Sequence, residues 1–195
     1  MSFPRAPLSF TLVHYPIRNK KGEDIATAVT NLDIHDGSRL AATYGMEHYF
    51  LVTPIEEQRS LVCRIRDHWI TGPGTKRNPQ RQEGMKRVEH ANSVEDACEF
   101  IANKHHVRPL LVGTSAKATG TQAISYSGLR QKIAEEDQPI LLLFGTGWGL
   151  SPSLHNTIDL FLPPIWGPTN YNHLSVRAAM AITLDRLLGD YEPRD

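Results

Sequence analysis

The chain has 195 residues, of which 40% are hydrophobic and 22% charged, as in an ordinary folded domain. Basic and acidic residues balance at 21 each, which argues against a protein that coats nucleic acid through its overall charge. No apolar run reaches the length of a membrane span and no signal peptide is recognisable, so we predict a cytoplasmic protein with no membrane partner. The length is typical of one well-buried α/β domain, and we therefore predict a single domain over residues 1–195.

Short apolar runs alternate with longer amphipathic segments along the chain. Each run is apolar on both faces, which is typical of parallel strands covered by helices. In chain order we predict a strand at Ser9–His14, a helix at 33–45, a strand at Tyr49–Thr53, helices at 56–70 and 93–105, a strand at Pro109–Gly113, a helix at 128–136, strands at Ile140–Gly145 and Asp159–Pro163, and a helix at Leu174–Leu188. This alternation predicts an α/β fold with a mostly parallel sheet.

A local signal refines the predicted helix at 93–105. Ser93 precedes its helix, and Asp96 follows three residues later, which resembles a capping box.

Cys63 and Cys98 fall in helical segments without CxxC spacing, so we expect reduced thiols. No HExxH motif or Cys/His cluster is present, and we therefore predict no metal site.

The segment between Arg59 and Arg87 is basic, with eight basic and two acidic residues. Its second half, Thr71–Arg87, has the sequence TGPGTKRNPQRQEGMKR and shows no periodic pattern. Seventeen residues are long for a loop in a compact domain, and such loops are usually functional or disordered. The charge favours a local anionic partner, and a merely solvated loop is the alternative.

A glycine-rich loop, FGTGWGL, follows the predicted strand at 140–145. Gly145, Gly147 and Gly149 form GxGxG, which is not the GxGxxG of dinucleotide-binding turns, and no GK[ST] follows. Similar ligand-type loops follow the strands at 109–113 and 159–163. Since the carboxyl ends of parallel strands meet at one edge of a sheet, these three loops predict a common ligand site.

These loops carry a resemblance to a known family. The ordered set TSA, FGTGWGL and PPIWG…YNHLSVRAAMAITLDRLLG, with the N-terminal NLDIHDGSRLAATYG, resembles the SPOUT class of S-adenosylmethionine-dependent RNA methyltransferases. The resemblance extends from Leu8 to Gly189 and is greatest for a bacterial branch of stand-alone SPOUT domains. It implies helices on both faces of the sheet, a C-terminal deep trefoil knot that holds S-adenosylmethionine, and a homodimer.

The resemblance also implies site residues. The cofactor site would comprise Thr114, Ser115, Phe144, Gly145, Thr146, Gly147, Trp148, Gly149, Leu162, Pro164, Ile165, Gly167, Tyr171, Asn172, His173, Leu174 and Ser175. Polar candidates for catalysis are Asp36, Arg39 and Asn172, and candidate RNA-binding cations are Lys76, Arg77, Arg81, Lys86 and Arg87. Gly37 departs from the larger apolar residue expected there and should weaken its helix.

Several of these residues have alternative interpretations. Trp148 would stack on the donor or anchor the core, and Asn172 or Ser175 would contact the donor or cap the last helix. Arg39 would hold the acceptor or pair with Asp36. The predicted function is methyl transfer from S-adenosylmethionine to RNA, either tRNA or rRNA. The alternatives are a non-catalytic module that binds S-adenosylmethionine or RNA, and methylation of a substrate other than RNA.

Overall fold

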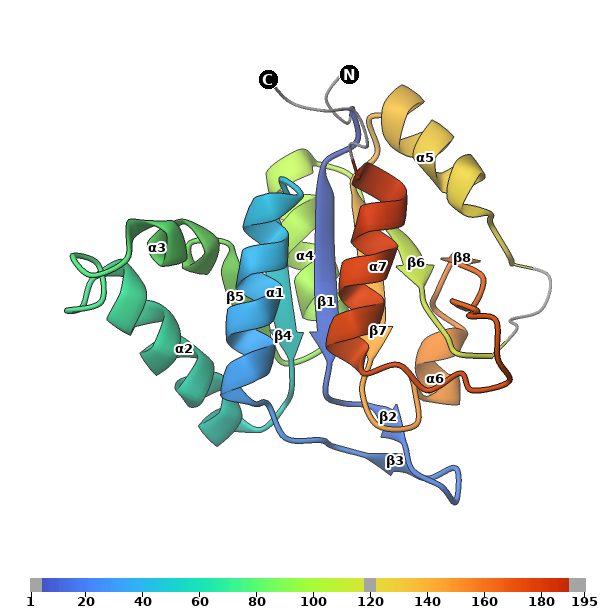
Figure 1. Cartoon of the computed structure of the whole chain (residues 1–195), viewed down its shortest axis with the longest axis horizontal. Helices are drawn as coiled ribbons and strands as arrows, with labels where there is room; N and C mark the ends of the chain where they lie inside the picture. The colour runs from blue at the N-terminus through green and yellow to red at the C-terminus, as the bar shows by residue number, and fades with distance from the viewer. Residues whose placement is uncertain (1–4, 118–121, 190–195) are drawn as a thin grey trace.

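A single sheet of six parallel strands forms the centre of the protein (Figure 1). The structure, a computed structural model, describes residues 5–117 and 122–189. The strands are β1 (Leu8–Val13), β4 (His48–Val52), β5 (Val88–Ala91), β6 (Leu110–Gly113), β7 (Ile140–Gly145) and β8 (Leu160–Phe161), in the order β5-β4-β1-β7-β6-β8. The predicted parallel sheet is confirmed, and β5 is a strand that the apolar pattern missed because its four residues are half polar.

Helices cover both faces of this sheet (Figure 1). One face carries α1 (Asn31–Thr43), α2 (Glu56–Ile70), α5 (Tyr126–Glu135) and α7 (Val176–Leu188), whose apolar residues join one core cluster. The other face carries α4 (Val94–His105) and α6 (Pro152–His155), which pack into a second cluster. None of the described helices is long and apolar enough to cross a membrane.

Side chains of each central strand alternate between these two clusters. In β4, Tyr49 and Leu51 face the α1 and α7 side, whereas Phe50 and Val52 face the α4 side. All four are at most 1% exposed. Two-sided burial explains why the strands read as continuous apolar runs in the sequence.

Gly37 has a structural reason to be glycine. A Cβ at this buried position of α1 would lie 2.2 Å from the Tyr49 ring, so only glycine lets the helix approach the sheet this closely. The Tyr49 hydroxyl then donates a hydrogen bond to the Asp33 carbonyl at 3.1 Å. Close packing against Tyr49 therefore explains why glycine stands here, and the weakening of the helix stays a prediction.

The sequence predicts an irregular loop at 71–87, and the structure shows that this prediction was wrong. This basic segment contains a short helix, α3 (Pro79–Met85), which begins after the cap Asn78 and has Pro79 in its first turn. Gly84 of α3 lies against α1, where a Cβ would meet the Ser38 carbonyl oxygen at 2.9 Å. Seven residues span too few turns to show a helical period, which is why the pattern was missed.

Two other local predictions agree with the structure. Ser93 caps α4 by accepting a hydrogen bond from the Asp96 amide at 3.0 Å. Cys63 and Cys98 are both free thiols. Burial raises the pKa of the Cys98 thiol to about 12, which keeps it protonated and unreactive.

Candidate cofactor site

A cavity of about 1070 Å³ lies beyond the carboxyl ends of β6 and β7 and beside the first turns of α7. Thirteen of the seventeen predicted cofactor residues line it. They are Thr114 and Ser115 after β6, Phe144, Gly145, Thr146, Gly147, Trp148 and Gly149 at the end of β7, and Ile165, Asn172, His173, Leu174 and Ser175 before α7. The three loops singled out in the sequence therefore meet at one place.

Four predicted cofactor residues, Leu162, Pro164, Gly167 and Tyr171, do not line this cavity. Leu162 is 1% exposed and belongs to the core on the α7 side of the sheet. Tyr171 is 72% exposed and contacts the His173 ring instead. A motif match identifies the loop but not which of its residues face the cavity.

The loop 145–149 is shaped by its glycines. Gly147 and Gly149 have φ angles of +55° and +99°, a region that other residues rarely adopt. A Cβ on Gly145 would lie 2.8 Å from the Leu150 backbone nitrogen. The backbone thus turns tightly along one wall of the cavity.

A hairpin that the sequence analysis missed, β2 (Ile17–Arg18) with β3 (Asp24–Ile25), supports this loop. The Arg18 amide donates to the Gly149 carbonyl at 2.9 Å, and the Trp148 amide donates to the Arg18 carbonyl at 3.3 Å. The Lys20 ammonium lies 5.4 Å from the Trp148 ring centre. The polar turn RNKKGED after β1 was the signal that could have revealed the hairpin.

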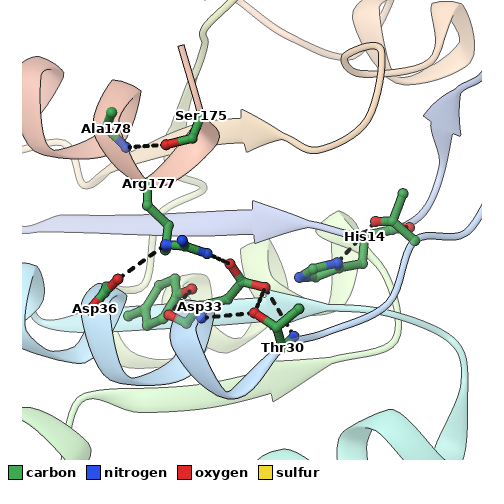
Figure 2. A network of polar contacts seen from close by, with 9 residues as sticks. His14, Thr30, Asp33, Asp36, Ser175, Arg177 and Ala178 are labelled. Atoms are coloured by element: carbon green, nitrogen blue, oxygen red, sulfur yellow. Dashed lines mark hydrogen bonds and ion pairs between the residues drawn. The ribbon is translucent and has the colours of Figure 1, made fainter.

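The last loop is joined to the loop after β6. The Asn172 side-chain amide donates to the Ala116 carbonyl at 2.7 Å, so this residue connects two walls of the cavity. Ser175 caps α7 through its hydroxyl, which accepts a hydrogen bond from the Ala178 amide at 3.2 Å (Figure 2). Trp148 is 57% exposed, so the interpretation of this residue as a core anchor was wrong.

Comparison with known proteins decides the family. Residues 7–189 match the family described as SAM-dependent RNA methyltransferase. The chain belongs to this family. A tRNA (guanine-N(1)-)-methyltransferase of Nitratidesulfovibrio vulgaris is 44% identical over 187 residues, which are 96% of this chain and 43% of that protein. An uncharacterized protein of Aquifex aeolicus is 43% identical over 90% of this chain and 85% of its own length.

The chain covers different shares of the proteins that it resembles. The chain spans less than half the length of the Nitratidesulfovibrio protein. Among solved structures, the SpoU methyltransferase AviRb of Streptomyces viridochromogenes in complex with AdoMet gives a TM-score of 0.56 at 15% identity, covering 93% of this chain and 57% of that one. This likeness supports the SPOUT-class fold.

In this SPOUT-class protein an ionic network joins α7 to α1 (Figure 2). The Arg177 guanidinium lies 3.3 Å from the Asp33 carboxylate and 3.1 Å from that of Asp36. Asp33 is 5% exposed and also forms a capping box with Thr30. Asp36 therefore pairs with Arg177, and the predicted alternative of an Asp36–Arg39 pair was wrong. Sequence reasoning missed Arg177 because its partners lie more than a hundred residues away.

The remaining predicted site residues lie outside the cavity. Arg39 is exposed on α1 and makes no ion pair with any described residue. Lys76 and Arg77 are exposed, whereas the Arg81 guanidinium lies 4.6 Å from the Trp69 ring centre. The other two candidates for RNA binding have partners within the protein: Lys86 pairs with Glu83 at 3.2 Å, and Arg87 donates to the Met46 carbonyl at 2.6 Å.

A buried histidine lies behind the glycine loop. His14 is 1% exposed, and its Nδ1 lies 3.0 Å from the Thr27 hydroxyl, which in turn contacts Thr146 at 2.5 Å. Burial lowers the pKa of His14 to about 4, although the nearby Asp33 carboxylate opposes the shift. His14 is therefore neutral at pH 7 and links the core to a residue of the cavity wall.

The pKa of His14 predicts how stability depends on pH. Because folding lowers this pKa from 6.5 to about 4, the unfolded chain takes up the proton first as the pH falls. The free energy of unfolding should therefore be fully retained above pH 6.5 and fall by up to about 3 kcal/mol toward pH 4. Urea titrations of the wild type and of His14→Gln measure the effect, since their difference removes the contributions of the other histidines. Parallel pH profiles of the two proteins would contradict the assignment.

Proposed function

We propose that this protein transfers a methyl group from S-adenosylmethionine to RNA, either tRNA or rRNA. The observation that carries the proposal is the convergence of three loops on one cavity at the carboxyl edge of a parallel sheet. Open α/β sheets bind their ligands at this edge. Membership of a SAM-dependent RNA methyltransferase family supplies the donor and the class of acceptor.

The chemistry of the cavity fits the donor. Its volume of about 1070 Å³ reaches the upper end of the range for small-molecule sites. Hydroxyls of Thr114, Ser115 and Ser175 lie among apolar groups such as Phe144 and Leu174. Such a lining suits a ligand that has an apolar ring face and several hydrogen-bonding groups. The tight glycine turn lets the main chain approach the ligand closely.

When bound, the donor would supply a methyl group on a sulfonium, and S-adenosylhomocysteine would depart as a neutral thioether, which is a good leaving group. The protein therefore has to position the acceptor and exclude water. We assign Asn172 to the cavity wall, where its side chain also fixes the adjoining loop. Asp36 is a positioning residue that acts through Arg177. Arg39 pairs with no carboxylate in the described part of the chain, so its guanidinium can hold an acceptor phosphate.

Four further features belong to the same proposal. We infer that residues 1–195 form one SPOUT-like domain, that the segment before α7 is part of a deep trefoil knot, and that the protein is a cytoplasmic homodimer. The hydrogen bond from Asn172 to Ala116 supports close contact between the loops that such a knot would join. Trp166 and Tyr171, which do not line the cavity, are 60% and 72% exposed, and large exposed apolar side chains favour a partner surface.

Replacement of Arg39 tests the catalytic part of the proposal. We expect Arg39→Ala to keep donor affinity within about threefold, because Arg39 does not line the cavity. Transfer of labelled methyl groups to RNA should fall by about a hundredfold, which corresponds to roughly 2.7 kcal/mol of transition-state stabilisation. Arg5→Ala, which removes another exposed arginine, is the control.

Two results would count against this assignment. Full transfer by Arg39→Ala would exclude a role for this guanidinium in the reaction. If the wild type bound the donor but transferred no methyl group to fractionated cellular tRNA or rRNA, a non-catalytic binding module or a different acceptor would replace the proposed function.

A further inference from the structure

A second hollow, of about 390 Å³, lies between α1 and α2 and shares no lining residue with the cofactor cavity. Asn31 and His35, one helical turn apart, contribute from α1. Arg64, His68 and Trp69 contribute from α2. None of the residues that line the hollow is acidic.

Aromatic groups are concentrated in this hollow. The Trp69 ring makes edge contacts with His68 at 5.0 Å and with His35 at 6.0 Å, measured between ring centres. The Arg81 guanidinium from α3 lies 4.6 Å from the Trp69 ring centre. The Trp69 surface, defined here as His35, Arg64, His68, Trp69 and Arg81, therefore combines planar rings with cations.

The two arginines of the Trp69 surface have no carboxylate partner among the described residues, although Arg81 lies over the Trp69 ring. Neither Arg64 nor Arg81 forms an ion pair with any residue in the described part of the chain. Arg66 on the same helix pairs with Glu89 at 3.1 Å, and the exposed Arg108 pairs with Glu95 at 3.1 Å. Two unpaired arginines beside one hollow leave guanidinium donors free for an external anion.

His35 lies partly buried in this surface, close to the charges of Arg81, Asp36 and Arg39. Burial lowers the pKa of its imidazole most, the charges of Arg81 and Arg39 lower it further, and the Asp36 carboxylate opposes the shift. Its Nδ1 atom is buried and has no hydrogen-bond partner in the described structure. A ligand with a hydrogen-bonding group would give this nitrogen a partner, and negative charge on the ligand would offset the nearby arginines.

We propose that the Trp69 surface is a second RNA contact, at which a nucleotide outside the methylated position places its base against Trp69 and its phosphate near Arg64 and Arg81. This inference rests on the proposed function, in which RNA is the acceptor. Stacking on aromatic rings together with arginine contacts to phosphate is how proteins bind unpaired nucleotides. A peptide partner would need carboxylates to match the arginines and would leave the Trp69 ring without a planar group to stack on it.

The position of the surface agrees with this role. In Figure 1, α1 lies between α2 and α7 on one face of the sheet. Arg39, the proposed acceptor contact, lies one turn along α1 from His35. An RNA that reaches the cofactor cavity beside α7 can therefore continue over α1 to the Trp69 surface.

Salt-dependent RNA binding tests the inference. We expect Arg64→Ala/Arg81→Ala to bind cellular tRNA or rRNA fragments about tenfold more weakly than the wild type at 0.15 M salt. The slope of log K against log salt should decrease by between one and two, since each lost phosphate contact contributes about 0.7 to 0.9. Donor affinity, measured by calorimetry, should not change. Arg5→Ala/Arg108→Ala is the matched control because it removes the same charge from two exposed arginines that pair with carboxylates.

The outcomes separate this inference from the proposed function. RNA binding by the wild type with an unchanged slope in the double variant overturns the inference and leaves the proposed function intact. Donor binding without any RNA binding by the wild type overturns the RNA acceptor itself. A change of the double variant from dimer to monomer in sedimentation shows that the surface joins two copies, which also overturns the inference.

A second measurement uses the unaltered protein. Hydrogen exchange of the wild type with and without RNA should show slower exchange in residues 61–69 of α2 when RNA is bound. Unchanged exchange in this segment, with slower exchange elsewhere, overturns the inference even if the variants fold poorly.

Discussion

Ending the chain at Asn170 is expected to abolish folding, because the missing helix α7 contributes to the main core. Met180, Leu184 and Leu187 are 0%, 0% and 5% exposed and pack in the same cluster as β1 and β7. Truncating one buried Leu or Met to alanine costs about 2 to 5 kcal/mol. Losing all three approaches or exceeds the total stability of about 5 to 15 kcal/mol that domains have.

The truncation also removes Arg177 and leaves the buried Asp33 carboxylate without its ionic partner. Circular dichroism and thermal melting measure the effect. Tyr171→Ala is the control, because this side chain is 72% exposed and its loss should leave the melting transition in place. A soluble truncated protein with a cooperative transition would show that the segment is peripheral to the fold.

Gly145→Val is expected to weaken S-adenosylmethionine binding by at least a hundredfold, or about 2.7 kcal/mol. A Cβ at this position would lie 2.8 Å from the Leu150 nitrogen and 3.1 Å from the Gly149 carbonyl carbon. These are backbone atoms, so the glycine loop itself must shift to admit the side chain. A shifted loop changes the wall of the cavity at six consecutive predicted contacts, 144–149.

Gly45→Ala provides a control for glycine replacement in general. Gly45 has a φ of +67°, but a Cβ there meets no atom within 4 Å, and the residue does not line the cavity. We expect a loss of stability of about 1 kcal/mol from backbone strain and unchanged donor affinity. Donor affinity of Gly145→Val within threefold of the wild type would mean that the donor does not contact this loop.

Most of the sheet could be predicted from the sequence because its strands are buried on both faces. Five of the six strands stand out as apolar runs, and the resemblance of the C-terminal motifs located the three loops that meet at the cavity. The short elements β2, β3, β5, α3 and α6 were missed, since two to seven residues carry no readable period.

Other features depend on contacts between distant parts of the chain. The partnership of Arg177 with Asp33 spans 144 residues, and the Trp69 surface forms only when α1, α2 and α3 pack together. The reason for Gly37 is likewise a ring on a neighbouring strand. Local propensity contains no information about such pairs, so only the folded structure reveals them.

Calorimetric titration of the protein with S-adenosylmethionine tests the central claim most directly, because the proposed reaction requires the cavity at β6 and β7 to hold this donor. We predict a single site with a dissociation constant in the micromolar range, or a binding free energy of about −8 kcal/mol. Absence of binding heat with both S-adenosylmethionine and S-adenosylhomocysteine, for a protein that melts cooperatively, would contradict the claim.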